Sequence, residues 1–455
     1  MKGKKLTFCG IGRSNMPLIE MFLKYGAIVS ARDKKEDLGE NGEILKNMGV
    51  KLITGENYLE NIDEDVLFRA PGMPLYLPEL NKARENGVVV TSEMEIFFDL
   101  CPCKIYGITG SDGKTTTSSV TAEILKADGK KVHLGGNIGR PLLPDIFEIN
   151  EDDAVVVELS SFQLISMRKS ADHALITNLA PNHLDVHKDM DEYVNAKKNI
   201  FIHQNAFSRT VLNLDNEITA SFKDEVRGNF MPFTRRAFIN KGTCAYEGKI
   251  YANGEYIMDT ADIKIPGNHN IENYLAAIAL IWGDVKKESI VTVAKTFGGV
   301  AHRAEFVREI NGVKFYNDSI ASSPSRAMSG TLSLYDEKII MIAGGADKNV
   351  PFDELGAVIC NKVKTLILVK PEEIKKGFKP NASEKIASAV RNAENYGENN
   401  PEIIFVKNME EAVDKALEKA VRGDKVSLCP ACTAFDMYLN FEVRGNYYKE
   451  IVLAK

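Results

Sequence analysis

Short apolar runs alternate with amphipathic stretches of helical spacing along most of the chain. Residues 5–9, 105–108 and 154–158 are mostly apolar, as expected of strands buried in a parallel sheet. Stretches such as residues 114–127 follow them with the periodicity of surface helices. Strands that alternate with helices in this way predict an α/β protein.

A glycine-rich turn joins the predicted strand at 105–108 to the predicted helix at 114–127. The segment carries the residue types of a phosphate-binding loop: Gly110, Ser111, Asp112, Gly113, Lys114, Thr115 and Thr116. Backbone N–H groups and the helix N-terminus favour phosphate there, the lysine adds a full charge, and a threonine hydroxyl can bind Mg²⁺. Ile108 stands where the standard Walker pattern has its first glycine, so we expect a shorter variant of that loop.

Three later residues are candidates for chemistry beside this loop. Glu158 ends an apolar strand, where its carboxylate could bind Mg²⁺ in the manner of a Walker B acid. His183 follows another strand, predicted at residues 173–178, for the same sheet. His187 lies four residues later, but Leu184 stands where a zinc protease has glutamate, which excludes that motif. Lys197 lies on a predicted helix. From the helix pattern alone, we interpret it as part of a solvent-exposed helix face.

The opening of the chain has the order strand, Gly-x-Gly, helix, strand and acid that is typical of a Rossmann-like unit. Its glycines are Gly10 and Gly12, but Asn15 stands where the third glycine of the dinucleotide fingerprint belongs. Asp33 lies about twenty residues further on, as for an acid that binds ribose. A nucleotide other than NAD is the favoured ligand, and a purely structural turn is the alternative.

Two asparagines near residue 270 are a further candidate for nucleotide contact. Asn270 and Asn273 lie three residues apart at the start of a helix predicted at 274–282, so they share one face. Helix capping explains part of this pattern, and recognition of adenine or ribose would explain the rest.

Composition shifts and loops divide the chain into three parts: residues 1–99, 100–299 and 300–455. We expect a Rossmann-like N-terminal domain and, after a hinge at 99–102, a central P-loop mononucleotide-binding ATPase domain. We expect that domain to contain an antiparallel excursion made of residues 210–214 and the segments around 235–239 and 249–256. The third part is predicted to be a second Rossmann-like α/β domain, with a helix at 325–335 and its own glycine loop at Gly344 and Gly345.

Bulk properties fit a globular protein that handles small molecules. The 455 residues are 44% hydrophobic and 26% charged, and the net charge of -6 without a basic tract makes nucleic acid a poor partner. With neither an apolar leader nor a long apolar run, we expect a cytoplasmic protein without membrane insertion. The seven cysteines include two pairs that are close in sequence, Cys101 with Cys103 and Cys429 with Cys432; we interpret them as packing residues, with redox chemistry as the alternative.

These motifs together resemble the Mur ligases of bacterial cell-wall synthesis. The resemblance spans all three domains and rests on these segments: Gly10–Gly12, Thr109–Thr116, Gly136–Gly139, Glu158–Leu164, Asn182-His183, Ala196-Lys197, Pro266–Asn270, His302-Arg303, Asn317–Ser319, Gly344-Gly345 with Lys348, Pro430-Ala431 and Arg444-Gly445. It implies an ATP-dependent amide ligase of peptidoglycan synthesis, acting as a monomer. The substrates it implies are UDP-N-acetylmuramoyl-L-alanine and D-glutamate, joined through an acyl phosphate.

The resemblance also implies site residues. The UDP substrate would be bound by Arg13, Ser14, Asn15, Arg32, Asp33, Pro71, Gly72, Asn137, Ser160 and Gln163. ATP would be bound by the phosphate loop, Gly110 to Thr116, with Asn270, Asn273, Arg303 and Asp318. The catalytic residues would be Lys114, Glu158, His183 and Lys197, and two Mg²⁺ ions would be held by Thr115, Glu158, His183 and a carbamylated Lys197. The amino acid would be bound by Lys348, Ser322 and Phe441.

Three positions depart from the family pattern. Asp112 replaces an asparagine, and we expect its acid to point away from the phosphates or towards a metal. Ile320 replaces a lysine and Ala434 a serine, both where D-glutamate would bind. A sister ligase for another amino acid is therefore the nearest alternative. A nucleotide-driven switch or motor and an oxidoreductase are alternatives from other classes, and the combination of Glu158, His183 and Lys197 argues against the switch or motor.

Overall fold

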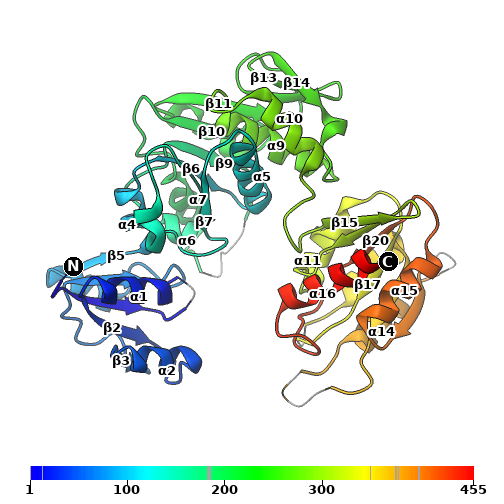
Figure 1. Cartoon of the computed structure of the whole chain (residues 1–455), viewed down its shortest axis with the longest axis horizontal. Coiled ribbons are helices and arrows are strands. Elements are labelled where there is room, and N and C mark those ends of the chain that lie inside the picture. Colours follow the sequence, from blue (N-terminus) through cyan, green and yellow to red (C-terminus); the bar gives the residue numbers. More distant parts are fainter. Residues whose placement is uncertain are drawn as a thin grey trace. The chain divides into compact units, whose positions relative to one another are not determined.

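The computed structural model describes residues 2–12, 14–181, 186–348, 350–374, 377, 379–397 and 400–455. The chain forms two compact units, one made of Met1–Ile263 with Asn268–Thr296, the other of Lys264–Gly267 with Phe297–Lys455. The described residues form three sheets, of five, nine and six strands, and helices alternate with these strands along the chain (Figure 1). The prediction of an α/β protein is therefore confirmed. None of the described helices combines the length and the apolar character needed to cross a bilayer.

The first sheet is parallel throughout and has the doubly wound order β3-β2-β1-β4-β5. Its strands are β1 (Lys5–Cys9), β2 (Ile28–Asp33), β3 (Lys51–Thr54), β4 (Val66–Arg69) and β5 (Val89–Thr91), and its helices are α1 (Met16–Lys24), α2 (Glu40–Asn47) and α3 (Pro78–Glu85). Phe8 and Phe68 on adjacent strands stack with ring centroids 4.8 Å apart, and Phe22 of α1 packs on both. The apolar strand pattern thus becomes a core between sheet and helix.

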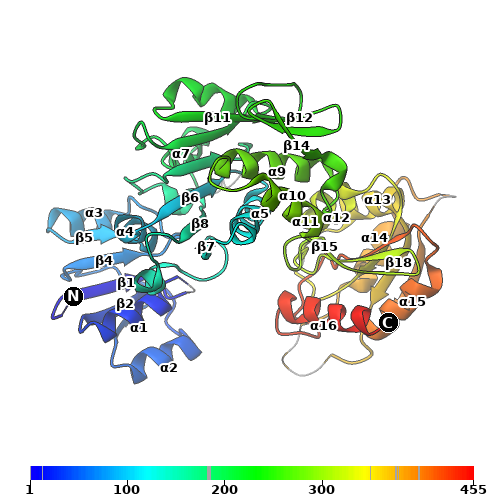
Figure 2. The same cartoon turned by 45° about the horizontal axis from the view of Figure 1, so that its top comes forward.

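The second sheet has the order β14-β13-β12-β11-β10-β9-β6-β8-β7. Its strands are β6 (Lys104–Thr109), β7 (Val132–Gly136), β8 (Ala154–Glu158), β9 (His173–Ile176), β10 (Arg209–Asn213), β11 (Asn229–Thr234), β12 (Thr243–Tyr246), β13 (Lys249–Ala252) and β14 (Glu255–Asp259). The associated α-helices are α4 (Glu93–Leu100), α5 (Lys114–Ala127), α6 (Ser161–Leu164), α7 (Met190–Lys198), α8 (Glu217–Ala220), α9 (Asn268–Ile281) and α10 (Lys287–Thr296). Helices α5, α9 and α10 pack together against this sheet (Figure 2).

The segment expected to be a hinge, residues 99–102, overlaps the last two residues of α4, a helix that Ser92 caps and that buries Phe97 and Phe98. The expected antiparallel excursion is wrong in part. The antiparallel excursion is confined to β12, β13 and β14, since β10, β11 and β12 pair in parallel. Residues 235–239 are not a strand: β11 ends at Thr234, whose hydroxyl donates to Asp215 at 2.5 Å.

The third sheet has the order β15-β16-β20-β17-β18-β19, parallel except for the hairpin of β15 and β16. Its strands are β15 (Glu305–Ile310), β16 (Val313–Asn317), β17 (Ile339–Ala343), β18 (Val363–Val369), β19 (Glu402–Val406) and β20 (Lys425–Leu428). Its helices are α11 (Pro324–Ser329), α12 (Thr331–Leu334), α13 (Asp353–Lys362), α14 (Ser383–Arg391), α15 (Met409–Lys419) and α16 (Phe441–Ala454). The single helix predicted at 325–335 is wrong, because Gly330 leaves the helical conformation (φ −90°, ψ −118°) and separates α11 from α12.

Candidate functional site

The turn between β6 and α5 needs glycine at two positions. Gly110 has a φ of 151° and Gly113 a φ of 79°, both in the region that side chains disfavour. A Cβ on Gly110 would overlap the hydroxyl of Thr177, and one on Gly113 would lie 2.5 Å from Oδ1 of Asn273. The backbone can pass this closely only because both side chains are absent.

Residues that follow β9 hold the turn in place. The backbone N–H of Ser111 donates to the carbonyl of Asn178 at 2.8 Å, and that of Asp112 donates to Asn178 Oδ1 at 3.0 Å. Thr177 Oγ1 donates to the carbonyl of Asp112 at 2.6 Å. Asp112 itself is exposed. Sequence reasoning missed Thr177 and Asn178 because residues 177 and 178 were expected to continue a strand.

Lys114 begins α5 and folds back over the turn. Its Nζ donates to the carbonyls of Gly110 and Ser111 at 3.0 and 2.9 Å. A helix of this length directs N–H groups out of its N-terminus and adds positive potential there. Thr115 and Thr116 follow on the same first turn and are half-buried. The turn thus combines a cation with a helix N-terminus, which suits a polyphosphate.

Glu158 ends β8 beside this turn, since β6 and β8 pair with Ile108 opposite Glu158. Its carboxylate is buried, and Oε1 accepts from Asn137 Nδ2 at 2.8 Å. Oε2 has no hydrogen-bond partner among the described residues. A buried carboxylate oxygen normally binds a donor or a cation. This oxygen therefore fits the magnesium ligand expected from the sequence.

Lys197, on α7, reaches the same turn from another direction. Nζ donates to Thr109 Oγ1 at 3.1 Å and to the carbonyl of Gly110 at 2.9 Å. Burial, aided by the positive charge of Lys114 and opposed by Glu158, lowers the pKa of Lys197 to about 7. The interpretation of Lys197 as part of a solvated helix face is wrong, because the side chain is 2% exposed.

Tyr193 is a further residue of this site that sequence reasoning missed. Its hydroxyl lies 2.9 Å from Ser111 Oγ, and its ring centroid lies 5.0 Å from Lys197 Nζ. It precedes Lys197 by one helical turn, and that spacing was the one available signal.

Asn270 and Asn273 lie within α9 and bind each other. Asn273 Nδ2 donates to Asn270 Oδ1 at 3.0 Å, and Asn273 Oδ1 accepts from Thr117 Oγ1 at 3.1 Å. Helix α9 begins at Asn268, so neither asparagine is the residue before the helix, as N-capping would require. The pair ties α9 to the first turns of α5, next to Gly113.

Several residues expected to bind the UDP substrate have partners inside the protein. Arg32 is buried and pairs with Glu64 at 3.1 Å, and its guanidinium also donates to three backbone carbonyls. Asn15 donates to the carbonyl of Gly10 at 2.9 Å, and Asp33 accepts from Ile11 N–H at 2.7 Å. A substrate contact by the Arg32 guanidinium would require this ion pair to break.

Other members of the UDP set lie at loops and helix starts. Ser160 and Gln163 form the capping box of α6, in which Gln163 Oε1 accepts from Ser160 N–H at 3.0 Å. Ser14 and Pro71 are half-buried and Gly72 is exposed. Arg13 and His183, both predicted site residues, lie outside the described residues.

The second unit holds the remaining candidates. Arg303 is exposed between His302 and Ala304, whose φ values of 63° and 42° are unusual for residues with side chains. Asp318 accepts from Ala304 N–H at 3.2 Å and from Thr331 Oγ1 at 2.7 Å, and burial raises its pKa to about 6. The proposed amino-acid ligands differ in exposure: Lys348 is exposed, whereas Ser322 and Phe441 are half-buried.

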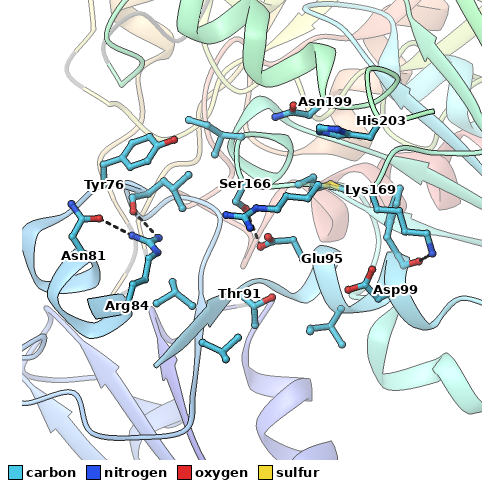
Figure 3. A pocket seen from close by; sticks show the side chains of 18 residues that line it. Tyr76, Asn81, Arg84, Thr91, Glu95, Asp99, Ser166, Lys169, Asn199 and His203 are labelled. Atoms are coloured by element: carbon cyan, nitrogen blue, oxygen red, sulfur yellow. Dashed lines mark hydrogen bonds between the residues drawn. The ribbon is translucent and has the colours of Figure 1, made fainter. Parts of the chain in front are cut away.

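A cavity of about 750 Å³ lies elsewhere in the first unit. Figure 3 shows Thr91 of β5, Glu95 of α4, and Ser166 and His203 among the residues that line it. None of residues 110–116, Glu158 or Lys197 lines this cavity. In the described part of the chain, no three His, Cys, Asp or Glu side chains surround a common metal position.

Comparisons with known proteins find relatives over nearly the whole chain. Residues 108–281 match the model of the Mur ligase middle domain, and residues 302–432 match that of the Mur ligase, glutamate ligase domain. The chain is 48% identical to a UDP-N-acetylmuramoylalanine--D-glutamate ligase of Clostridium kluyveri, over 99% of this chain and 97% of that protein. Identity to the Clostridium botulinum protein of the same name is 47%, with the same coverage. The structure of a UDP-N-acetylmuramate-alanine ligase of Thermotoga maritima shares the fold, with a TM-score of 0.56 and 18% identity over 99% of both chains.

Proposed function

The chain belongs to the Mur ligase family, and we propose that it is an ATP-dependent ligase that adds D-glutamate to UDP-N-acetylmuramoyl-L-alanine in peptidoglycan synthesis. Relatives that carry this name are 47–48% identical to it over 99% of its length. The single structural observation that carries the proposal is the meeting of Lys114, Glu158 and Lys197 at one glycine turn.

The reaction joins a carboxylate to an amine, and the carboxylate must first be activated. Its oxygen attacks the terminal phosphate of ATP, so that ADP leaves and an acyl phosphate forms. The D-glutamate amine then attacks the acyl carbon, phosphate leaves, and the amine proton passes to solvent. Lys114 and the N-terminus of α5 would stabilise the charge on the transferring phosphate.

Magnesium would neutralise charge on the phosphates and on the attacking carboxylate. We propose two ions, held by Thr115, Glu158, His183 and Lys197. The unpartnered Oε2 of Glu158 supports this assignment. The lowered pKa of Lys197 leaves a large share of its amine neutral near pH 7, as attack on CO₂ requires. The product would be a carbamate and one released proton, which turns a cation into an anionic ligand.

The three parts of the chain would divide the substrates among them. We propose that residues 1–99 bind the UDP moiety, residues 100–299 bind ATP, and residues 300–455 bind the amino acid. Arg303 and Asp318 would contact the nucleotide. The amino acid would contact Lys348, Ser322 and Phe441. We further propose a cytoplasmic monomer that binds no nucleic acid.

An acceptor screen tests the function. Purified protein is mixed with ATP, Mg²⁺ and UDP-N-acetylmuramoyl-L-alanine, each candidate amino acid is added in turn, and phosphate release and the nucleotide product are followed. Among the amino acids tested, only D-glutamate should support both phosphate release and formation of the nucleotide product. Turnover with a different amino acid would instead assign a sister ligase, with Ile320 and Ala434 as the first positions to examine.

Two variants test the site. Lys114→Ala should lower phosphate release that depends on both substrates by more than about tenfold, or about 1.4 kcal/mol of barrier; a smaller loss would remove the phosphate-loop assignment. Lys197→Ala should lose activity and regain part of it with a short-chain carboxylate. Full activity of this variant without the additive would remove the carbamate proposal.

A further inference from the structure

Two thiols meet in the short connection between α4 and β6. Cys101 Sγ and Cys103 Sγ lie 3.9 Å apart, and either can donate a hydrogen bond to the other. Cys101 is half-buried, whereas Cys103 and the other five cysteines of the chain are buried. The pair is thus the one place among the seven cysteines, all of them described, where adjacent thiols include a solvent-accessible member.

Local backbone geometry brings these side chains together. Cys101 has φ −61° and ψ 122°, the extended conformation that a following proline favours. In an extended segment, residues two apart point to the same side, and Pro102 limits departures from that conformation. The backbone bends at Cys103 before β6 begins. Both thiols therefore face one side of a stiff three-residue segment.

The connection is anchored on both sides of the pair. Cys101 N–H donates to the carbonyl of Phe97 at 2.9 Å, which closes the last turn of α4. Ile105 N–H donates to Asp172 Oδ2 at 2.8 Å, which fixes the first residues of β6. A small adjustment of the thiols can therefore be confined to residues 101–104.

The two thiols are also chemically unequal. The hydrogen bond shared with Cys103 lowers the pKa of Cys101, with help from the positive charge of Lys169 and against burial and Asp172. The same hydrogen bond and burial raise the pKa of Cys103. Lys169 is held beside the end of α4, where its Nζ donates to the carbonyl of Phe98 at 2.5 Å. This asymmetry is that of a nucleophilic thiol with a neighbouring resolving thiol.

We propose that Cys101 and Cys103 form a thiol–disulfide exchange site for low-molecular-weight disulfides. The Cys101 thiolate attacks one sulfur of the small disulfide, whose S–S bond breaks and releases one thiolate. Cys103, losing its proton to solvent, then attacks Cys101 Sγ in the mixed disulfide and expels the second thiolate. The protein dithiol is oxidised, the small disulfide is reduced to two thiols, and atoms and electrons balance.

The resulting bond would be easily reversed. It closes a loop of three residues, so it removes little entropy from the unfolded chain and adds little stability. Bonds with such weak stabilisation belong to the labile, regulatory class of disulfides. The pair would therefore respond to the surrounding thiol–disulfide ratio and would not serve as a permanent staple.

The test is mass spectrometry of the whole folded protein. The protein is incubated with oxidised glutathione, quenched in acid, alkylated with N-ethylmaleimide and digested. The peptide with Cys101 and Cys103 should lose two hydrogen atoms and escape alkylation, and dithiothreitol should restore it. Cys103→Ser should instead accumulate a glutathione adduct on Cys101, and Cys101→Ser should give neither product at Cys103.

The pair Cys429 and Cys432 is the matched internal control. Both are buried, and burial raises the pKa of both thiols, that of Cys432 to about 12. They should remain reduced and react only after denaturation in guanidinium. The proposal is overturned if Cys101 and Cys103 are alkylated as completely after oxidised glutathione as before it. It is also overturned if both pairs oxidise at equal rates in the folded protein.

Discussion

The glycine turn makes a sharp prediction for Gly110→Ala. The new Cβ would overlap Oγ1 of Thr177 and would lie 3.1 and 3.2 Å from the carbonyl oxygen and the nitrogen of Asn178. The φ of 151° is a second obstacle, because side chains rarely adopt it. The turn must therefore move, and with it the donors that we propose bind the phosphates.

The size of the effect follows from these contacts. The backbone conformation costs an alanine about 1–3 kcal/mol. Displacing Thr177 weakens the hydrogen bond from its hydroxyl to the carbonyl of Asp112, worth about 1 kcal/mol. The expected loss of unfolding free energy is thus about 2–4 kcal/mol. A shift of about 1 Å in catalytic groups costs on the order of 100-fold in rate, so kcat/KM should fall at least that far.

Urea unfolding and ATP-dependent phosphate release measure the two effects. Gly129→Ala is the matched control: Gly129 has φ 92°, but a Cβ there meets nothing within 4 Å, so it should cost about 1–2 kcal/mol without loss of activity. Gly110→Ala combined with Thr177→Ala should relieve the overlap with the hydroxyl, but the backbone cost, the close approach to Asn178 and the loss of the Thr177 hydrogen bond should remain. If the Gly110→Ala variant had the unfolding free energy and the turnover of wild type, the requirement for glycine at this turn would be refuted.

Three further predictions concern ionisable groups that the structure buries. Glu158→Gln should lower kcat/KM by about 100-fold in the ligase assay, since the unpartnered oxygen loses its charge; unchanged turnover would contradict its role. Arg32→Met should cost about 3–5 kcal/mol in urea unfolding by leaving Glu64 unpaired, and Glu64→Leu should restore most of it. A raised KM at unchanged stability would instead show that Arg32 serves the substrate. Burial raises the pKa of Glu93 from 4.5 to about 7 despite two backbone N–H donors, so the folded state holds this proton more tightly. Wild type should lose up to about 3 kcal/mol relative to Glu93→Gln as pH rises from 4.5 to 7 in pH-dependent unfolding, and parallel curves would contradict this.

Local signals in the sequence were enough for much of the fold. Strand and helix positions followed from apolar runs because the sheets are largely parallel and buried on both faces. The glycine turn was recognisable because Gly110 and Gly113 are required by backbone geometry within a few residues of Lys114. The exceptions are short: Gly330 interrupts a helix that the apolar pattern continues through.

Whether Arg32 binds a ligand or forms a buried ion pair could not be predicted from its neighbours in sequence. An arginine at the end of a strand, next to Asp33, has the pattern of a ligand contact in a Rossmann-like unit. Its partner, Glu64, lies on a different connection and becomes adjacent only when β1, β2 and β4 assemble. Deciding between a binding arginine and a buried ion pair required that long-range contact.

The burial of Lys197 also arises from contacts between segments that are distant in sequence. It matters more for the proposed reaction, because it changes the pKa of the amine. Strand β6 pairs with β8 on one side and β9 on the other, so the ends of strands that are not consecutive in sequence meet at its turn. Helix α7 follows β9 and places Lys197 on that turn, within hydrogen-bond distance of Gly110. Removed from water and set near Lys114, the amine loses its proton far more readily than an exposed lysine does. The reactivity we propose for Lys197 is thus a property of strand order, which no single motif in the chain encodes.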